Sequence, residues 1–333
     1  MSLNDFVVDA LIRTERYKNT RLWTVENHAK YSTLTAPLAS SGNPSRFNLQ
    51  IFQLMCALNQ QGMAEDGLCA DAQGQGALKD ILGTLAERLA LLSENRHVHY
   101  VELGPEPIKT AHLLGRITEA CTSLRYTAID INQTSESVMR DAVFPIVEQH
   151  GSFNYIAADY RTVERADLHH EQDITLITLL GFQEGNELPV TTGRLIRSLA
   201  SDATYIISEM QIYEEGLQSN IHAFYANPHM IRFSQVVAMQ QGFIPLDEHA
   251  VTLVRFKLLD ELIHVAVTLQ PVEKGRQQGC LLTNICLKYT PEQFRRIRAR
   301  HCNCSVLDEF ASGDGSVRYQ IAKYLQKQHH REP

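Results

Sequence analysis

The stretch HVHYVELGPEPIKTAHLLGRITEACTSLRYTAIDIN, residues 97–132, constrains the fold more than any other part of the chain. It predicts a buried strand at 98–103, a Gly/Pro turn at 104–107, a helix at 109–121 and a second strand at 126–131. A turn at the carboxyl end of a parallel strand presents backbone N–H groups to the charged end of a nucleotide-like ligand. An acidic side chain at the end of the next strand, here Asp130, suits a ribose diol.

The turn at 104–107 decides which nucleotide-like ligand fits best. It does not follow the G-x-G-x-x-G pattern, because it holds one glycine and two prolines, Pro105 and Pro107, which have no N–H to donate. A pyrophosphate would therefore find few backbone donors. The turn favours a ligand with a ribose and no phosphate, such as S-adenosylmethionine, over a dinucleotide.

Strands and helices alternate from residue 98 to residue 209, which is typical of a parallel sheet covered on both faces. After a helix at 135–149, the pattern predicts strands at 153–160, 173–181 and 204–210, with a helix at 189–199. Ligands of such sheets bind at the carboxyl ends of the strands. Four residues fall at such ends and are expected to converge on one crevice: Gly104, Asp130, Asp159 and Gly181.

The rest of the chain predicts a second unit and a closing unit for the sheet. Helical patterns cover 4–33, 47–59, 77–93 and 214–241, a loop falls at 39–46, and a hairpin at 251–271 precedes a strand at 279–290. Thr290 is expected to cap a further helix, and two strands within 306–326 follow it. A helix and an antiparallel pair after five parallel strands are typical of a seven-stranded methyltransferase sheet.

We therefore predict an α/β fold, a Rossmann-like seven-stranded class I methyltransferase sheet with an inserted α+β substrate-binding domain. The Rossmann-like domain is expected to comprise residues 77–209 and 287–327. Residues 210–286 form the predicted insertion, and residues 1–76 form a helical region that contributes to the substrate domain.

Composition and charge argue against several classes of function. The net charge of −7 argues against a nucleic-acid partner, because phosphate neutralisation needs a basic surface. No apolar run approaches the roughly 20 residues of a membrane span, and the N-terminus lacks a signal peptide's apolar core. Seven scattered cysteines then suggest reduced thiols in a cytoplasmic protein. The HCNC run at 301–304 lacks a second Cys/His pair, so no metal is predicted. We expect a monomer or homodimer that acts on a small molecule.

Six segments keep the order of the motifs of one enzyme family. VELGPEPIKTAHLL resembles ELGSG…KT, TAIDIN resembles a strand ending in an Asp for the ribose, and AADY resembles GDF. LLGFQEGN resembles LGSTIGN, TERYKNTR resembles EYYPTR, and LLTNICLKY resembles RTEISxKY. In these segments the chain resembles the histidine-specific methyltransferases of ergothioneine biosynthesis and their relatives. The resemblance implies an S-adenosylmethionine-dependent methyltransferase.

The strand-end positions and the resemblance together indicate a cofactor site. Asp130 is expected to bind the ribose hydroxyls, Asp159 to bind the adenine amine and Tyr160 to stack on the adenine. Gly104 would let the methionine part approach the backbone, and Lys109 could pair with its carboxylate. The complete predicted cofactor-binding set is Glu102, Gly104, Lys109, Asp130, Asp159, Tyr160 and Gly181.

The resemblance also implies an acceptor pocket, with Tyr17 and Asn186 as its catalytic residues. The predicted substrate-binding set is Tyr17, Asn186, Tyr213, Tyr225, Asn284 and Cys286. The chain departs from the family pattern at two of these positions. Asn284 stands where the family has a glutamate that holds the histidine imidazole, and Cys286 stands in a serine position. Loss of the carboxylate argues against histidine as the substrate, and an amide suggests a neutral polar or aromatic group on the acceptor.

Each of these side chains also has a purely structural interpretation. Asp130 could cap a following helix, and Asn186 could sit in a turn. Lys109 could be solvated, Tyr17 could be packing, and Asn284 could be a buried structural amide. Five basic residues near the end of the chain are interpreted as a solvated helix face and not as a nucleic-acid patch. They are Lys288, Arg295, Arg296, Arg298 and Arg300.

The sequence thus predicts a methyltransferase that acts on a small acceptor, the amine of an amino acid or a related metabolite, in a specialised biosynthetic role. Three alternatives stay open. An enzyme could transfer the aminocarboxypropyl group of the same cofactor, as nicotianamine-type synthases do. A relative without catalysis could have kept the cofactor crevice. A dinucleotide oxidoreductase ranks last because of the two prolines in the turn.

Overall fold

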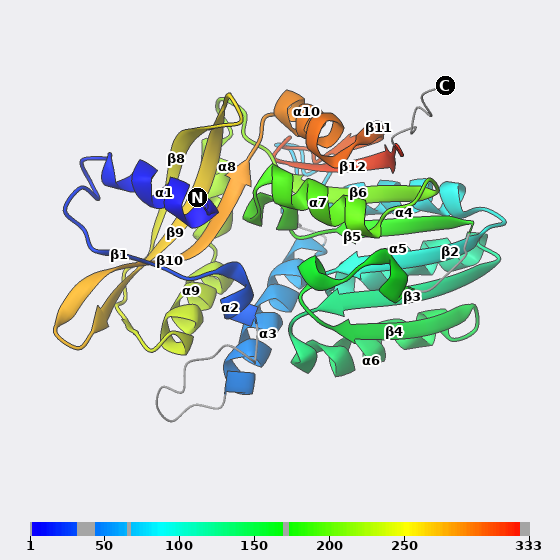
Figure 1. Cartoon of the computed structure of the whole chain (residues 1–333), viewed down its shortest axis with the longest axis horizontal. Coiled ribbons are helices and arrows are strands. Elements are labelled where there is room, and N and C mark those ends of the chain that lie inside the picture. Colours follow the sequence, from blue (N-terminus) through cyan, green and yellow to red (C-terminus); the bar gives the residue numbers. More distant parts are fainter. Residues whose placement is uncertain (1, 32–43, 65–67, 169–172, 327–333) are drawn as a thin grey trace, which may run out of the picture.

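The computed structural model describes residues 2–31, 44–64, 68–168 and 173–326. Its larger sheet has the strand order β11-β12-β6-β5-β2-β3-β4 (Figure 1). Strands β2 to β6 pair in parallel, whereas β12 runs antiparallel to both β6 and β11. This confirms the predicted seven-stranded α/β sheet. The strands are β2 (His97–Leu103), β3 (Ser123–Asp130), β4 (Gly151–Ala157), β5 (Ile174–Leu179), β6 (Thr204–Gln211), β11 (Cys304–Ala311) and β12 (Val317–Tyr324).

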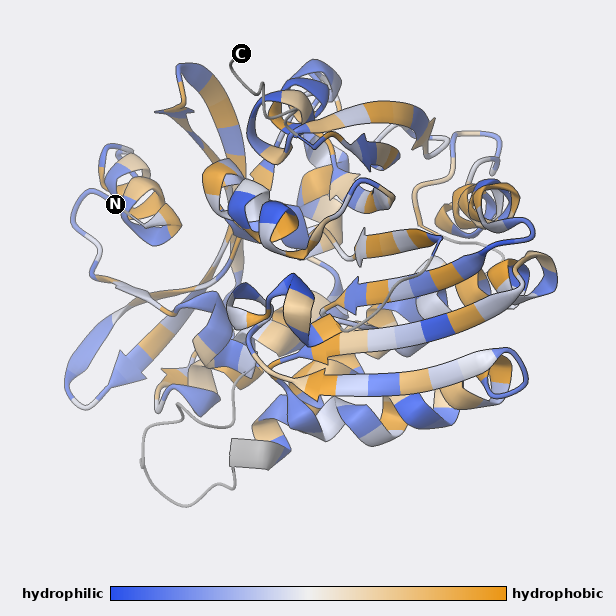
Figure 2. Ribbon diagram, turned by 45° about the vertical axis from the view of Figure 1, so that its right-hand side comes forward, coloured by the Kyte–Doolittle hydropathy of each residue, from blue (hydrophilic) through white to orange (hydrophobic). Residues whose placement is uncertain are grey.

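Helices cover both faces of this sheet. Strand β2 shows why, because Val98 and Tyr100 belong to one buried cluster and Val101 and Leu103 to another. The first cluster includes side chains of α4, α5 and α6, and the second includes side chains of α7 and α10. Figure 2 shows the hydrophobic residues along these strands. The helices are α4 (Leu78–Ser93), α5 (Pro107–Ala120), α6 (Glu136–Val147), α7 (Pro189–Leu199) and α10 (Pro291–Cys302).

A second sheet of five strands lies beside the first (Figure 1). The predicted hairpin is the pair of β8 and β9, and its turn residues Leu259 and Asp260 both have positive φ, which matches the twist of a two-residue hairpin loop. Helix α3 (Pro44–Gly62) packs against α9 (Pro228–Gln240) on this side and against α5 on the other. The strands are β1 (Leu22–Thr24), β7 (Ile244–Pro245), β8 (Ala250–Leu258), β9 (Glu261–Lys274) and β10 (Gln277–Lys288).

The helical prediction for 4–33, with its break at TERYKNTR, is wrong at residues 22–24, and residues 32 and 33 lie outside the described residues. The structure has α1 (Leu3–Ile12), a turn region, strand β1 and α2 (Asn27–Tyr31). The polar TERYKNTR segment ends the first helix, and β1 then pairs in parallel with the edge of β10. Of the loop predicted at 39–46, residues up to 43 lie outside the described residues, and Pro44 already begins α3.

The helix predicted at 214–241 is divided into α8 (Gln218–Tyr225) and α9 (Pro228–Gln240). Asn227 caps the second helix by accepting a hydrogen bond from the His229 N–H, and Pro228 occupies its first turn. Proline suits that position because the first-turn N–H has no partner inside the helix. The break brings the end of α8 towards the strands of the second sheet.

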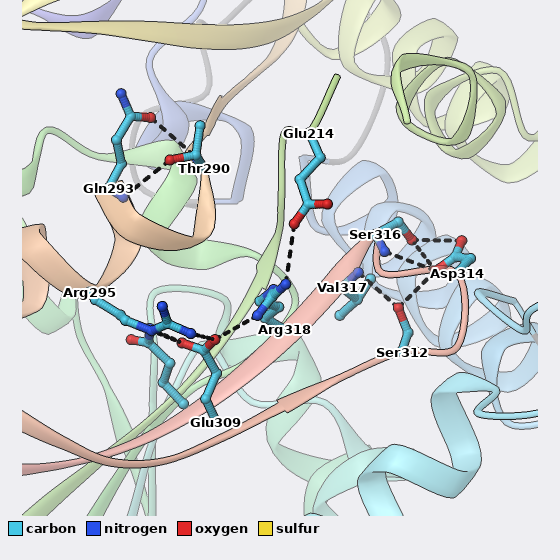
Figure 3. Close-up of polar contacts among 11 residues, drawn as sticks. Glu214, Thr290, Gln293, Arg295, Glu309, Ser312, Asp314, Ser316, Val317 and Arg318 are labelled. Carbon is cyan, nitrogen blue, oxygen red and sulfur yellow. Dashed lines mark hydrogen bonds and ion pairs between the residues drawn. The ribbon is translucent and has the colours of Figure 1, made fainter. Parts of the chain in front are cut away.

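Polar contacts fix α10 and the last two strands to the sheet (Figure 3). Thr290 and Gln293 form the capping box at the start of α10, as predicted for Thr290. Glu309 on β11 pairs with Arg295 of α10 and with Arg318 of β12, each at 2.7 Å. None of the described helices is both long and apolar enough to span a membrane.

Candidate functional site

A cavity of about 230 Å³ lies at the carboxyl ends of β2, β3, β4 and β5, where the sequence predicts a crevice. Residues from α2, α3, α8 and β10 form the opposite wall, so the cavity lies between the two sheets. Ten of the predicted site residues line it: Gly104, Lys109, Asp130, Asp159, Tyr160, Gly181, Asn186, Tyr225, Asn284 and Cys286.

Three of the predicted residues do not line the cavity. Glu102 is buried beneath it and accepts hydrogen bonds from Thr110 and Tyr126 at 2.6 and 2.7 Å. Tyr17 packs in the hydrophobic cluster of the second sheet. The Tyr213 ring stacks on the His264 ring with a centroid separation of 3.5 Å.

The turn after β2 has the shape expected of a ligand-binding turn and an unexpected charge. Gly104 adopts φ +62, a left-handed conformation that favours glycine. The Gln183 amide donates to the Gly104 carbonyl at 2.9 Å. Glu106, which the sequence analysis missed, caps α5 by accepting hydrogen bonds from the Ile108 and Lys109 N–H groups. Burial raises the pKa of its carboxyl. A carboxylate therefore stands where a phosphate-binding turn would need donors.

Lys109 is not free to pair with a ligand carboxylate as the sequence suggested. Its Nζ lies 2.6 Å from Glu209 Oε2, and both side chains are almost completely buried. Glu209 also accepts from the Tyr319 hydroxyl at 2.7 Å and from the Gly181 N–H at 2.6 Å. Glu209 lies near the carboxyl end of β6, the last of the parallel strands, so the strand-end rule that identified Gly181 could also have identified Glu209. The lysine charge is thus neutralised within the protein.

Asp130 is placed as expected for a ribose-binding carboxylate. It ends β3 and lines the cavity, and its Oδ1 accepts a hydrogen bond from the Asn132 N–H at 2.9 Å. No ion pair to Asp130 is present among the described residues. Burial therefore dominates and raises the pKa of Asp130 to about 7.

This pKa predicts that cofactor affinity depends on pH. Ribose hydroxyls donate best to an ionised carboxylate, so affinity for S-adenosylhomocysteine is expected to rise as pH increases through about 7. Calorimetric titrations across this range measure the trend. Asp130→Asn should flatten it, and an identical trend in that variant would contradict the assignment.

The stability of the empty protein should respond to Asp130 in the opposite direction. The pKa of Asp130 in the folded state, about 7, exceeds the unfolded value of about 4. The stabilising contribution of Asp130 is therefore fully present below about pH 4 and is lost as the pH rises through the folded pKa.

The loop after β4 places Asp159 and Tyr160 at the cavity as predicted, but Asp159 is already engaged. The Arg161 side chain and N–H donate to its carboxylate at 2.5–3.1 Å. Burial pushes the pKa of Asp159 upward, but the hydrogen bonds and charge of Arg161 outweigh it and hold that pKa below its usual value. Arg161 and Asp159 therefore form an ion pair at the cavity wall where the sequence predicts the adenine site.

The acceptor side gathers polar side chains from distant parts of the chain. Asn186 follows β5, Tyr225 ends α8, and Asn284 lies on β10. The Asn27 amide, from α2, donates to the Asn186 carbonyl at 3.1 Å and ties the N-terminal segment to this wall. Asn27 lines the cavity, and no pattern in the sequence marked it.

A buried ion pair supports the segment that carries Asn186. Arg298 Nη2 donates to Glu184 Oε1 at 2.5 Å and to Ser208 Oγ at 2.6 Å. The prediction of a solvated basic face is thus wrong for Arg298, which is 1% exposed, and for Lys288, which is 0% exposed. Arg298 lies on the inward side of α10 with Phe294 and Ile297, a position that charge alone does not reveal.

Gly185 keeps this segment close to β10. A Cβ there would collide with Cys286 Sγ and lie 2.9 Å from the Leu287 carbonyl oxygen. Gly185→Ala is expected to lower the free energy of unfolding by about 1–3 kcal/mol through overpacking. Gly83→Ala, in α4 with no neighbour within 4 Å of the added Cβ, is the matched control. It should stabilise by about 0.5–1 kcal/mol. Equal urea midpoints for the two variants would contradict the close packing.

Comparison with known proteins reveals only remote similarity. No protein-family model matches the chain, and no curated protein is similar to it in sequence. Among solved structures, an S-adenosylmethionine-dependent methyltransferase from Clostridium acetobutylicum is 10% identical, with a TM-score of 0.43 over 74% of this chain and 92% of that one. Magnesium protoporphyrin IX methyltransferase from Synechocystis is also 10% identical, with a TM-score of 0.45 over 85% and 97%. The fold assignment rests on the strand order and not on these similarities.

Proposed function

We propose that the protein is an S-adenosylmethionine-dependent methyltransferase that acts on a small acceptor, the amine of an amino acid or a related metabolite. The observation that carries this proposal is the charge around the Gly104 turn. Glu106 and Asp130 line the cavity, neither forms an ion pair within the part of the chain that the structure describes, and Lys109 is neutralised by Glu209. A ligand with a sulfonium and an ammonium group suits such a wall, and a pyrophosphate does not.

The placement of the remaining side chains supports the same ligand. Asp130 could accept hydrogen bonds from the ribose, and Tyr160 lies on the adjacent loop where an adenine would stack. Gly104 and Gly181 offer backbone at the methionine end. When bound, the cofactor supplies an activated methyl group, and the chain's own residues need only orient the two reactants and exclude water.

Support for a small polar acceptor comes from the opposite wall. Asn186 and Asn284 line this part of the cavity beside apolar side chains such as Phe52, Met55 and Phe224, and Tyr225 lies next to them. We propose that residues 1–76 and 210–286 form the substrate-binding part, because α2, α3, α8 and β10 supply this wall. A cytoplasmic monomer or homodimer without a nucleic-acid partner stays a prediction from the sequence.

Product mass distinguishes the proposed transfer from its nearest alternative. The purified protein is incubated with S-adenosylmethionine and a panel of amino acids and amines, and the products are weighed by mass spectrometry. A product heavier by one methylene unit supports methyl transfer. A product heavier by an aminocarboxypropyl group would overturn it in favour of the nicotianamine-synthase type of reaction. Binding without any product would favour a relative that has lost catalysis.

A further inference from the structure

We propose that the ammonium group of Lys288 holds Cys286 as a thiolate at the acceptor side of the cavity, where the thiolate accepts the proton that an amine acceptor must lose. The thiolate part concerns the protein alone. The proton-accepting part rests on the proposed methyl transfer.

The geometry of Lys288 is unusual for a lysine. Its side chain is completely buried, and Nζ donates to Tyr225 Oη at 2.9 Å and to Cys286 Sγ at 3.1 Å. The rings of Phe182 and Tyr225 lie 5.2 and 4.9 Å from it. No carboxylate among the described residues pairs with it. Cys286 and Tyr225 both line the cavity, so Lys288 stands directly behind its wall.

A buried ammonium without an anionic partner is costly, so one of the groups in contact with Lys288 is expected to carry a negative charge. Tyr225 cannot supply the anion, because burial raises the pKa of its hydroxyl well above the usual value. Cys286 can. Its other polar neighbours are the Leu287 and Phe182 carbonyl oxygens at 3.7 and 3.8 Å, which are weak acceptors for a thiol proton. The shorter contact to Lys288 favours a thiolate–ammonium pair.

A second buried amine adds positive charge on the same side. Lys30 of α2 is 2% exposed and donates to Asn27 Oδ1 at 2.7 Å. Burial lowers its pKa to about 8, while the charges of Glu26 and Cys286 act in the opposite direction. Burial also lowers the pKa of Lys288, and Cys286 opposes that shift.

The proposed step is a proton transfer followed by a displacement. The ammonium form of the acceptor gives one N–H proton to Cys286 Sγ, and the electron pair of that bond stays on nitrogen. The nitrogen then attacks the methyl carbon, the carbon–sulfur bond of the sulfonium breaks, and its electron pair stays on the sulfur of S-adenosylhomocysteine. The proton leaves Cys286 for solvent before the next turnover.

Ultraviolet absorbance tests the thiolate without any cofactor or acceptor. At neutral pH the wild-type protein should absorb more than Cys286→Ser by the absorbance of one thiolate. Lys288→Met should remove this difference, and Lys288→Arg should keep it. Equal absorbance of the wild-type protein and Cys286→Ser would overturn the proposal. Because no ligand is present, this outcome is independent of whether the protein binds S-adenosylhomocysteine.

Thiol modification gives a second readout with internal controls. Burial raises the pKa of the other six thiols, including the more exposed Cys121 and Cys280. Cys286 itself is 1% exposed, so its rate is compared between variants and not with the rates of more exposed thiols. With limiting methyl methanethiosulfonate at neutral pH, peptide mass spectrometry should show Cys286 modified about tenfold more slowly in Lys288→Met than in the wild-type protein, whereas the other six thiols keep their rates. A Cys286 rate unchanged in Lys288→Met would overturn the proposal.

Discussion

Replacing Glu209 by alanine is expected to lower the free energy of unfolding by about 3–5 kcal/mol, the largest stability effect that we predict. Glu209 is fully buried and accepts hydrogen bonds from Lys109, from the Tyr319 hydroxyl and from the Gly181 N–H. Its removal leaves a buried ammonium and the buried Tyr319 hydroxyl unpaired. Urea denaturation measures the loss as a shift of the midpoint at constant slope.

The exposed pair of Arg116 and Glu119 on α5 is the matched control. Solvent screens that pair, so Glu119→Ala should change stability by less than about 1 kcal/mol. The double variant Lys109→Met/Glu209→Ala should recover part of the loss, because it no longer buries an unpaired charge. A loss in Glu209→Ala no larger than in Glu119→Ala would contradict the buried pair.

Asp130→Ala is expected to weaken S-adenosylhomocysteine binding about tenfold or more, since charge-assisted hydrogen bonds are worth about 1.5–3 kcal/mol each. The variant should stay folded, because within the described structure the Asp130 side chain accepts hydrogen bonds only from backbone N–H groups of the two following residues. Calorimetric titration of the folded variant measures the effect.

Asp141→Ala is the control for this variant. Asp141 is an exposed carboxylate on α6 that does not line the cavity. Its substitution removes one negative charge, as Asp130→Ala does, but leaves the cavity unchanged. Affinity should then match that of the wild-type protein. An Asp130→Ala protein that is folded and binds with unchanged affinity would overturn the proposed cofactor site.

The sequence predicted the parts of the fold that local patterns determine. The sequence predicts Asp130, Asp159 and Gly181 at the carboxyl ends of the strands, where the structure has them. This prediction follows from the apolar run before Gly104, the acid at the end of the next strand and the alternation of strands and helices after it. The β8–β9 hairpin and the capped start of α10 also follow from short-range signals. These features depend on the spacing of neighbouring residues, which a single sequence displays directly.

The partners of buried charges could not be predicted in the same way. Lys109 pairs with Glu209, and Arg298 pairs with Glu184, across about 100 residues of sequence. A charged residue on a helix is expected to be solvated unless a distant partner is known, so Arg298 and Lys288 were assigned to the surface. Strand β1 is not predicted for a related reason. Its residues, Leu22–Thr24, are extended because they pair with the edge of β10, which lies more than 250 residues later in the chain.

Calorimetric titration of the purified protein with S-adenosylhomocysteine, with NAD as the control ligand, tests the central claim most directly. The acidic wall around Gly104 and the position of Asp130 predict micromolar binding of S-adenosylhomocysteine and no binding of NAD. Binding of NAD in the absence of any affinity for S-adenosylhomocysteine would contradict the proposed cofactor and, with it, the proposed methyl transfer.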